Sequence, residues 1–264
     1  MKTENELISI IIPMYNCSPY FDETISSVIA QTYANWEALC VDDCSTDDTY
    51  QKALSYAEKD PRIKVYKNEK NAGPSLSRNF ALEKSSGRYV AFLDSDDVWM
   101  PEKLQKQLNF MEKTGASVCI TDYMTIEEDG TFRNIVSVPE RTSYKQFLSN
   151  TLTCSHTVLI DTAKVDRTLL VMPDIKAGQD FAAWLQITRA GHDFYGLNEP
   201  LAKYRRHGGS ISSNTLFAVK CTWRVYRDIE KLPLHTAIRC FLGYGFRAVK
   251  KRLPFFGKKK ESDK

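Results

Sequence analysis

Short hydrophobic runs alternate with amphipathic stretches along the first 115 residues of the chain. The runs are rich in β-branched and aromatic side chains, which favours buried strands, and they lie at 8–14, 36–43, 63–68 and 88–94. Between them apolar side chains recur with helical spacing, which predicts helices at 20–33, 47–59, 75–85 and 101–115. This alternation predicts an α/β fold with a mostly parallel, Rossmann-like sheet flanked by helices.

The pattern changes after residue 116. Residues 116–138 predict a hairpin that turns at Asp129–Gly130, whereas residues 143–177 show no clear periodicity. A helix is predicted at 178–191, a strand followed by a loop at 193–212, and amphipathic helices at 213–253 with an interruption at Pro233. We therefore expect one main domain at 1–212, with halves at 1–115 and 116–212, and a helical extension at 213–264.

Composition narrows the class of protein. The hydrophobic content of 42% is typical of a globular chain, and no run of 18 apolar residues predicts a membrane span. The N-terminus has no signal-peptide pattern. The seven cysteines are odd in number and form no Cys-x-x-Cys, which argues against a disulfide framework and favours the reducing cytosol.

Charge is distributed unevenly. With 13 Lys/Arg against 4 Asp/Glu, residues 220–264 carry a net charge of +9. Because the whole chain carries +3, residues 1–219 carry −6. A mildly acidic body with a strongly basic tail favours an anionic partner, either nucleic acid or a membrane surface.

Three acids follow the strand predicted at 88–94. Asp94 and Asp96 share one face of an extended segment, and Asp97 follows them. Ligands of open α/β sheets bind at the carboxyl ends of strands, and two carboxylates there suit Mg²⁺ or Mn²⁺ with positions left open for phosphates. The alternative interpretation is that these acids cap the helix at 101 or are solvated.

Asp42 and Asp43 repeat this placement at the end of another predicted strand. Residues 43–54 do not form a calcium loop, because they lack the glycine and the glutamate that such a loop requires at its sixth and twelfth positions. The chain also lacks a P-loop and the glycine fingerprint of dinucleotide-binding folds. A nucleotide would therefore be held by a metal and by side chains, with an acid accepting hydrogen bonds from the base or ribose.

Four motifs in order, followed by two more, resemble the family 2 glycosyltransferases of the GT-A fold. They are SIIIPMYN (9–16), VDDCSTDDT (41–49), SRNFAL (77–82), FLDSDDVW (92–99), GQDFAAWLQI (178–187) and YRRHGGSIS (204–212). The resemblance covers residues 7–213. The tail resembles, more loosely, bacterial members that build capsule, teichuronic acid or O-antigen chains.

The resemblance implies roles for individual residues. The nucleotide-sugar would contact Pro13, Tyr15, Asn16, Asp42, Asp43, Arg78, Asp94 and Ser95. Mn²⁺ or Mg²⁺ would be held by Asp96 and His207. Asp180 would be the catalytic base, and Gln179 stands before it where the family usually has glutamate.

The resemblance also implies an activity. The expected enzyme is an inverting, metal-dependent glycosyltransferase that moves a hexose or N-acetylhexosamine from a UDP-sugar to a lipid-linked glycan acceptor in bacterial surface polysaccharide synthesis. Residues 1–115 would be its nucleotide-binding half and residues 116–212 its acceptor side. A catalytically inactive nucleotide- or glycan-binding relative remains an alternative. A sugar nucleotidyltransferase is disfavoured, because no glycine-rich signature follows the first strand.

The basic tail is consistent with this activity. Residues 234–260 form a helical pattern. Its apolar side has Leu234, Ala237, Ile238, Phe241, Leu242, Ala248 and Val249, its basic side has Arg239, Arg247, Lys250 and Lys251, and Phe255, Phe256 and three lysines follow. This composition is typical of a helix at an anionic membrane interface, although an ordinary helix packed on the domain is the alternative. Nucleic acid is not expected as a partner. The predicted location is cytoplasmic, peripheral on the inner face of the cell membrane.

Overall fold

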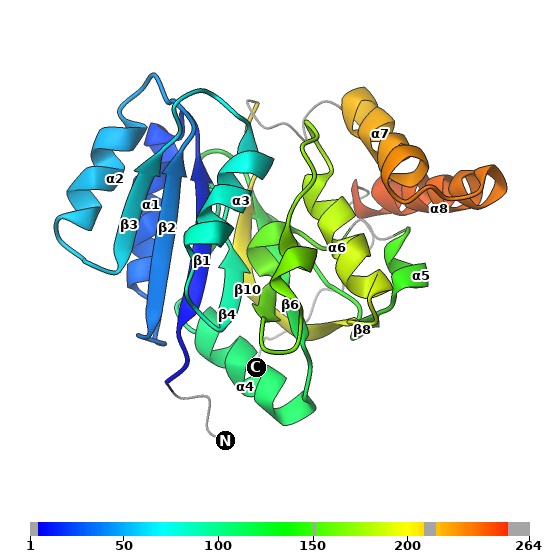
Figure 1. The fold of residues 1–264 in the computed structure, drawn as a ribbon, viewed down its shortest axis with the longest axis horizontal. Helices are drawn as coiled ribbons and strands as arrows, with labels where there is room; N and C mark the ends of the chain where they lie inside the picture. The colour runs from blue at the N-terminus through cyan, green and yellow to red at the C-terminus, as the bar shows by residue number, and fades with distance from the viewer. Residues whose placement is uncertain (1–4, 150–151, 209–214, 253–264) are drawn as a thin grey trace.

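The computed structural model describes residues 5–149, 152–208 and 215–252 (Figure 1). Its described strands form a sheet in the order β3-β2-β1-β4-β9-β6-β10-β5, with β7 and β8 at its margins. The first half is parallel throughout, as predicted. It consists of β1 (Ile8–Met14), β2 (Trp36–Asp42), β3 (Ile63–Lys67) and β4 (Tyr89–Phe92).

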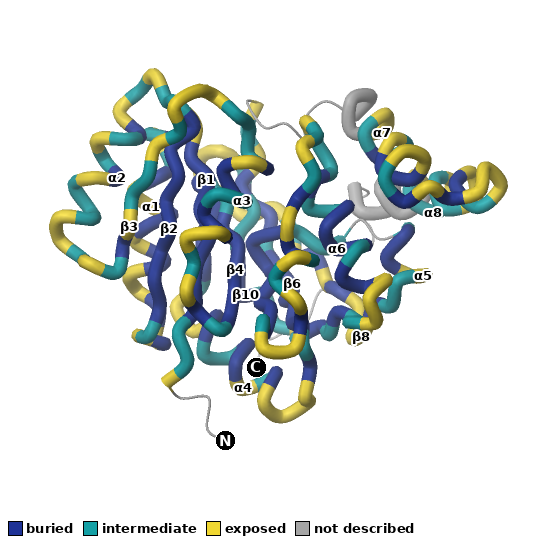
Figure 2. Tube along the Cα trace, in the orientation of Figure 1, coloured by how far each residue is buried: buried dark blue, intermediate teal, exposed yellow. Residues whose placement is uncertain are grey.

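Helices cover both faces of this half because alternate strand residues point to opposite sides. Ile8, Ile10 and Ile12 pack in one core cluster with α1 (Ser18–Ile29), α2 (Thr49–Ala57) and α4 (Lys103–Thr114). Ile11 packs in the other cluster with α3 (Pro74–Lys84). Figure 2 shows the central strands buried between these helix layers.

The second half of the sheet is mixed, with one parallel pair of strands among antiparallel ones. The three-residue strand β9 (Leu159–Asp161) runs antiparallel to both β4 and β6 (Val118–Ile126). β6 forms the predicted hairpin with β7 (Phe132–Val136), and Gly130 takes the left-handed conformation in its turn (φ +86°). β10 (Phe194–Arg205) runs parallel to β6 and antiparallel to β5 (Val98–Trp99) and β8 (Arg141–Thr142).

In its described residues, the segment without periodicity contains only short elements. They are α5 (Tyr144–Phe147), the 3₁₀ turns η1 (Ser155–Thr157) and η2 (Arg167–Leu170), and β9. Elements this short carry no repeat that a sequence pattern can show. α6 (Gln179–Arg189) follows as predicted and packs Trp184 against Phe92 of β4, with ring centroids 5.4 Å apart.

The C-terminal helices pack on α6. They are α7 (Thr215–Arg224), the π-helical turn η4 (Val225–Ile229) and α8 (Leu234–Arg252), which begins directly after Pro233. Val225, Tyr226 and Ala237 are buried in the same cluster as Trp184 of α6. Within the described residues, no helix is long and apolar enough to cross a bilayer. Phe255, Phe256 and the last lysines lie outside the described residues.

Candidate active site

One cavity of about 740 Å³ opens at the carboxyl ends of β1, β2 and β4 and reaches the N-terminus of α6. It is the position at which open α/β sheets bind ligands. Ten of the eleven predicted site residues line it, and they are Pro13, Tyr15, Asn16, Asp43, Arg78, Asp94, Ser95, Asp96, Asp180 and His207. The sequence-predicted set is therefore brought together from six separate regions of the chain.

Asp42 is the predicted site residue that does not line the cavity. It is fully buried, and its Oδ2 accepts a hydrogen bond from the backbone N–H of Ser45 at 3.2 Å. Lys67 lies 4.0 Å from the same oxygen. Because Asp42 is the last residue of β2, its side chain points to the opposite side from that of Asp43, and it supports the loop rather than the cavity wall.

Asp43 organises the neighbouring loop. Its Oδ1 accepts hydrogen bonds from Asn68 Nδ2 (2.7 Å) and the Ala72 N–H (2.8 Å). Its Oδ2 accepts a hydrogen bond from the N–H of Gly73, at 2.7 Å. Gly73 lines the cavity and begins α3, so the Asp43 carboxylate fixes the segment that carries Arg78.

Asn16 joins the two loops that follow β1 and β2. Its backbone is left-handed (φ +48°), a conformation that asparagine tolerates. Its Oδ1 accepts a hydrogen bond from the Thr46 N–H at 2.8 Å, and its own N–H donates to Ser45 Oγ. Tyr15 beside it is exposed at the cavity rim.

Arg78 places a positive charge at the cavity wall. Its side chain is buried, and Nη2 donates a hydrogen bond to Asp94 Oδ1. Nε and Nη1 have no hydrogen-bond partner among the described residues. Unpaired buried donors are costly, so these two atoms suit an anionic ligand in the cavity.

Asp96 and His207 contact each other across the cavity. His207 Nε2 lies 2.8 Å from Asp96 Oδ2, and the imidazole packs on the Tyr20 ring. Burial and the nearby Asp94 charge raise the pKa of Asp96. A carboxylate with an imidazole fits Mn²⁺ or Mg²⁺, and within the described residues no cluster of three or more such side chains forms a fuller ligand set. Two protein ligands would leave most coordination positions for phosphate oxygens.

Asp97 has a different environment from its two neighbours. It is fully buried, and its Oδ1 accepts a hydrogen bond from the Arg205 N–H at 2.9 Å. Its Oδ2 lies 2.7 Å from His156 Nδ1. Burial raises the pKa of Asp97 to about 6, while His156 opposes the shift. The third acid of the motif therefore ties the loop to β10 and to η1.

Asp180 lies in the first turn of α6 at the far wall of the cavity. Its Oδ2 accepts a hydrogen bond from Ser155 Oγ at 3.3 Å. Burial raises the pKa of Asp180, and the Arg78 charge partly counteracts the rise. A carboxylate with a raised pKa accepts a proton more readily, as a general base must. Gln179 is buried beside it, and its Oε1 has no partner in the described part of the chain.

The sequence did not single out several cavity residues. They are His156 and Ser155 of η1, Tyr204 of β10, Tyr20 of α1, and Thr222 and Tyr244 of the C-terminal helices. Two of them offered a signal, because His156 is a histidine in a segment without periodicity and Tyr204 begins the motif YRRHGGSIS. The others reach the cavity through tertiary packing, since α7 and α8 supply part of its wall.

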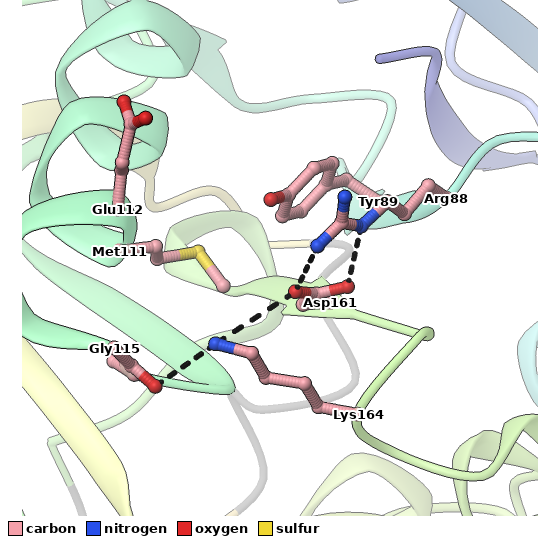
Figure 3. Close-up of a pocket in the computed structure, with 8 residues that line it drawn as sticks. Arg88, Tyr89, Met111, Glu112, Gly115, Asp161 and Lys164 are labelled. Atoms are coloured by element: carbon pink, nitrogen blue, oxygen red, sulfur yellow. Dashed lines mark hydrogen bonds and ion pairs between the residues drawn. The ribbon is translucent and has the colours of Figure 1, made fainter. Parts of the chain in front are cut away.

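A smaller cavity of about 240 Å³ lies near the amino ends of β4 and β6 (Figure 3). Arg88 forms a two-bond ion pair with Asp161, and Lys164 lies 4.0 Å from the same carboxylate (Figure 3). Lys164 also donates to the Gly115 carbonyl (Figure 3). These charged groups pair with one another and connect β4, β9 and the end of α4. The cavity therefore has no evident chemistry.

Sequence comparison decides the family. Residues 9–169 match the family described as Glycosyl transferase family 2. The chain belongs to this family. The glycosyltransferase is 44% identical over 254 residues to a Bacillus subtilis (strain 168) protein assigned to teichuronic acid biosynthesis as the glycosyltransferase TuaG, covering 96% of this chain and 100% of that protein.

A second relative carries a more specific name. It is the Escherichia coli UDP-Glc:alpha-D-GlcNAc-diphosphoundecaprenol beta-1,3-glucosyltransferase WfgD, 37% identical over 253 residues, with 94% of this chain and 96% of that protein covered. Both relatives match almost the full length of this glycosyltransferase.

Solved structures confirm the GT-A fold. Staphylococcus aureus TarS 1–349 with UDP-GlcNAc superposes with a TM-score of 0.70 at 22% identity, covering 92% of this chain and 72% of that one. The mannosyltransferase PcManGT of Pyrobaculum calidifontis, solved with GDP-Man and Mn²⁺, also gives 0.70 at 15% identity, covering 94% and 76%. At these identities the likeness establishes the fold alone.

Proposed function

We propose that this glycosyltransferase is an inverting, metal-dependent enzyme that transfers a sugar from a UDP-sugar to a lipid-linked glycan in bacterial surface polysaccharide synthesis. The observation that carries the proposal is the position of Arg78. Its charge acts on Asp94, Asp96 and Asp180, so the predicted donor, metal and base residues surround one cationic group in one cavity.

The donor would bind between the loops after β1 and β2 and the acids after β4. Arg78 would direct its two unpaired donors at the diphosphate, and Asp96 with His207 would hold Mn²⁺ or Mg²⁺. The ion, when bound, neutralises the charge that develops on the departing nucleoside diphosphate. Asp94, fixed by Arg78, would accept hydrogen bonds from the ribose or the donor sugar.

Asp180 would take the proton of the acceptor hydroxyl as that oxygen attacks the anomeric carbon. Ser155 holds the carboxylate at the start of α6, facing the cavity. The residue before Asp180, Gln179, is neutral, and we assign the other carboxylates at this end of the described cavity, Asp94 and Asp96, to the donor and the metal, so neither would act as a nucleophile. A single displacement follows, and it inverts the configuration at the anomeric carbon.

The relatives support the choice of substrates. The name of WfgD specifies a UDP-Glc donor and a diphosphoundecaprenol-linked acceptor, and that of TuaG specifies teichuronic acid biosynthesis. This chain matches both over nearly its full length. We therefore infer a UDP-hexose or UDP-N-acetylhexosamine donor and a polyprenyl-diphosphate glycan acceptor.

Calorimetric titration tests the donor site. UDP, GDP and CDP are titrated into the protein with and without Mn²⁺, and UDP-sugars that bind are then incubated with extracts of lipid-linked glycans. We expect tight, Mn²⁺-dependent binding of UDP and transfer of label to lipid. Binding without transfer or donor hydrolysis would favour the catalytically inactive relative, and absence of nucleotide binding would contradict the proposal.

We further propose that α8 holds the enzyme on the cytoplasmic face of the membrane. Leu234, Ile238 and Leu242 are exposed and spaced four residues apart, so they form one apolar stripe. Ala237 and Phe241 turn towards the protein, where Ala237 is buried and Phe241 packs on Trp223. The net charge of +9 in residues 220–264 complements anionic lipids.

Vesicle flotation tests this contact. The full chain is mixed with phosphatidylcholine vesicles with or without phosphatidylglycerol, alongside a Leu234→Ser, Ile238→Ser, Leu242→Ser variant. We expect binding to the anionic vesicles that falls about tenfold or more in the triple variant. Leu54→Ser, an exposed leucine on α2, is the matched control. Equal flotation of all three proteins would refute the membrane role of α8.

A further inference from the structure

His156 is held in one orientation in the cavity wall. Its side chain is 1% exposed, and Nδ1 lies 2.7 Å from Asp97 Oδ2. The ring stacks on Tyr204 (5.8 Å between centroids, 12° between planes) and meets Tyr123 edge-on. Its backbone carbonyl accepts a hydrogen bond from Trp99 Nε1 at 2.8 Å. These contacts remove the freedom of the ring to turn.

One nitrogen of this fixed ring remains unused. Nε2 has no hydrogen-bond partner in the described part of the chain. A buried polar atom without a partner costs about 1–3 kcal/mol, so such atoms in native proteins usually pair with water or a ligand. His156 lines the active-site cavity, so a ligand bound there is the candidate for the missing partner.

The position of His156 indicates which part of the substrate it contacts. On one side Asp97 follows Asp96, the proposed metal ligand that holds the diphosphate. On the other side, Ser155 directly precedes His156 and donates a hydrogen bond to Asp180, the proposed base. If the proposed function holds, the transferred sugar occupies this interval, because its anomeric carbon must lie between the diphosphate and the incoming hydroxyl.

We propose that His156 is a specificity-determining residue whose Nε2 hydrogen-bonds one hydroxyl of the transferred sugar. A hydroxyl both donates and accepts, so it pairs with Nε2 in either tautomer of the ring. Asp97, itself fixed by the Arg205 N–H, orients the imidazole. A site built around such a hydrogen bond discriminates strongly against the sugar that lacks the hydroxyl.

Two variants separate this role from a structural one. His156→Asn can keep a donor near the Nδ1 position for Asp97 while removing Nε2. His156→Gln places an amide near the position of Nε2 and is expected to recover part of the lost contact. His192→Asn is the control. His192 hydrogen-bonds Ser117, which directly precedes the amino end of β6, whereas the cavity lies beyond the other end of the sheet.

The first probe is UDP. The second is whichever of UDP-glucose and UDP-N-acetylglucosamine binds more tightly, and it is compared with its own 3-, 4- and 6-deoxy derivatives. Each is titrated calorimetrically with Mn²⁺ into the wild type and the variants. For the wild type, one deoxy derivative is expected to bind about tenfold more weakly than its parent. For His156→Asn, the parent sugar is expected to bind about tenfold more weakly, with no further loss for that derivative, and UDP affinity stays unchanged.

Equal deoxy penalties in the wild type and His156→Asn would overturn this inference while leaving the proposed function intact. A parallel loss of UDP affinity in His156→Asn would do the same, because it would assign the residue to the nucleotide side. If the wild type binds no UDP-sugar, the proposed function fails, and this inference fails with it.

Discussion

His207 Nε2 lies 2.8 Å from Asp96 Oδ2, although 111 positions separate the two residues in the chain. The antiparallel pairing of β10 with β5 makes this contact possible, because Lys203 pairs with Val98. The loop after β10 is thereby placed beside the acids that end β4. Both residues line the same cavity, where they form the proposed metal pair.

Replacing Asp96 with asparagine is expected to weaken UDP binding at least about tenfold and to make the remainder independent of Mn²⁺. The reason is that a carboxylate is a far better ligand for a hard cation than an amide. Calorimetry with and without Mn²⁺ measures both effects. Asp22→Asn, at an exposed position on α1, is the matched control. If UDP binding by Asp96→Asn depends on Mn²⁺ as strongly as in the wild type, the ion is held by other residues.

Replacing Asp180 with asparagine is expected to abolish transfer without loss of donor binding. Loss of a general base typically reduces kcat by about 10²–10⁴-fold, whereas UDP contacts other residues. Transfer to the lipid-linked acceptor gives kcat, and calorimetry with UDP gives the Kd. A variant that keeps its kcat would exclude Asp180 as the base, and a parallel loss of UDP affinity would assign it to the donor site.

The pH dependence of the reaction follows from the burial of Asp180. Burial raises its pKa above the ordinary aspartate value of about 3.9. The base must be deprotonated, so kcat/KM should fall as the pH drops through this raised pKa. The Arg78 charge holds that pKa down, and Arg78→Gln should therefore move the acidic limb to higher pH. A limb at the same pH in both proteins would mean that another group controls it.

Replacing Arg78 with lysine is expected to weaken UDP binding about tenfold although the charge is kept. Arginine offers donors in a planar fork, and two of these, Nε and Nη1, are unpaired in the cavity wall. Lysine cannot supply both while bonding Asp94. UDP and uridine are compared by calorimetry, and the loss should be confined to UDP. Equal losses for both ligands would point to the nucleoside side of the site.

Replacing Asp43 with alanine is expected to destabilise the fold by about 1–3 kcal/mol and to weaken nucleotide binding. Three donors, from Asn68, Ala72 and Gly73, lose their acceptor, and the segment that leads into α3 is released. Urea unfolding measures the stability. Asp48→Ala, at an exposed position in the same loop, should change stability by less than about 0.5 kcal/mol. If Asp43→Ala has the same free energy of unfolding as the wild type, the Asp43 carboxylate of the wild type is available to bind the nucleobase.

The sequence by itself determined the parallel half of the sheet and the positions of most acids. Strands and helices in residues 8–115 have a strong local period, and the end of a strand can be located from the same pattern. The ordered motifs then identified the family. Asp94, Asp96 and Asp180 could be singled out in this way, because the position of each depends on the element directly beside it in the chain.

Only the tertiary structure decided which of these acids faces the cavity. The sequence does not distinguish Asp42 and Asp97 from the aspartates beside them, yet Asp42 supports a loop and Asp97 pairs with His156. β9 is three residues long, too short to show a period, and its antiparallel pairing shapes the segment that carries His156. Helical spacing marked Leu234 and Phe241 as one apolar side, but packing on Trp223 covered Phe241 and left Leu234 exposed. Local patterns record which residues are apolar or charged, whereas contacts between distant segments determine what each one meets.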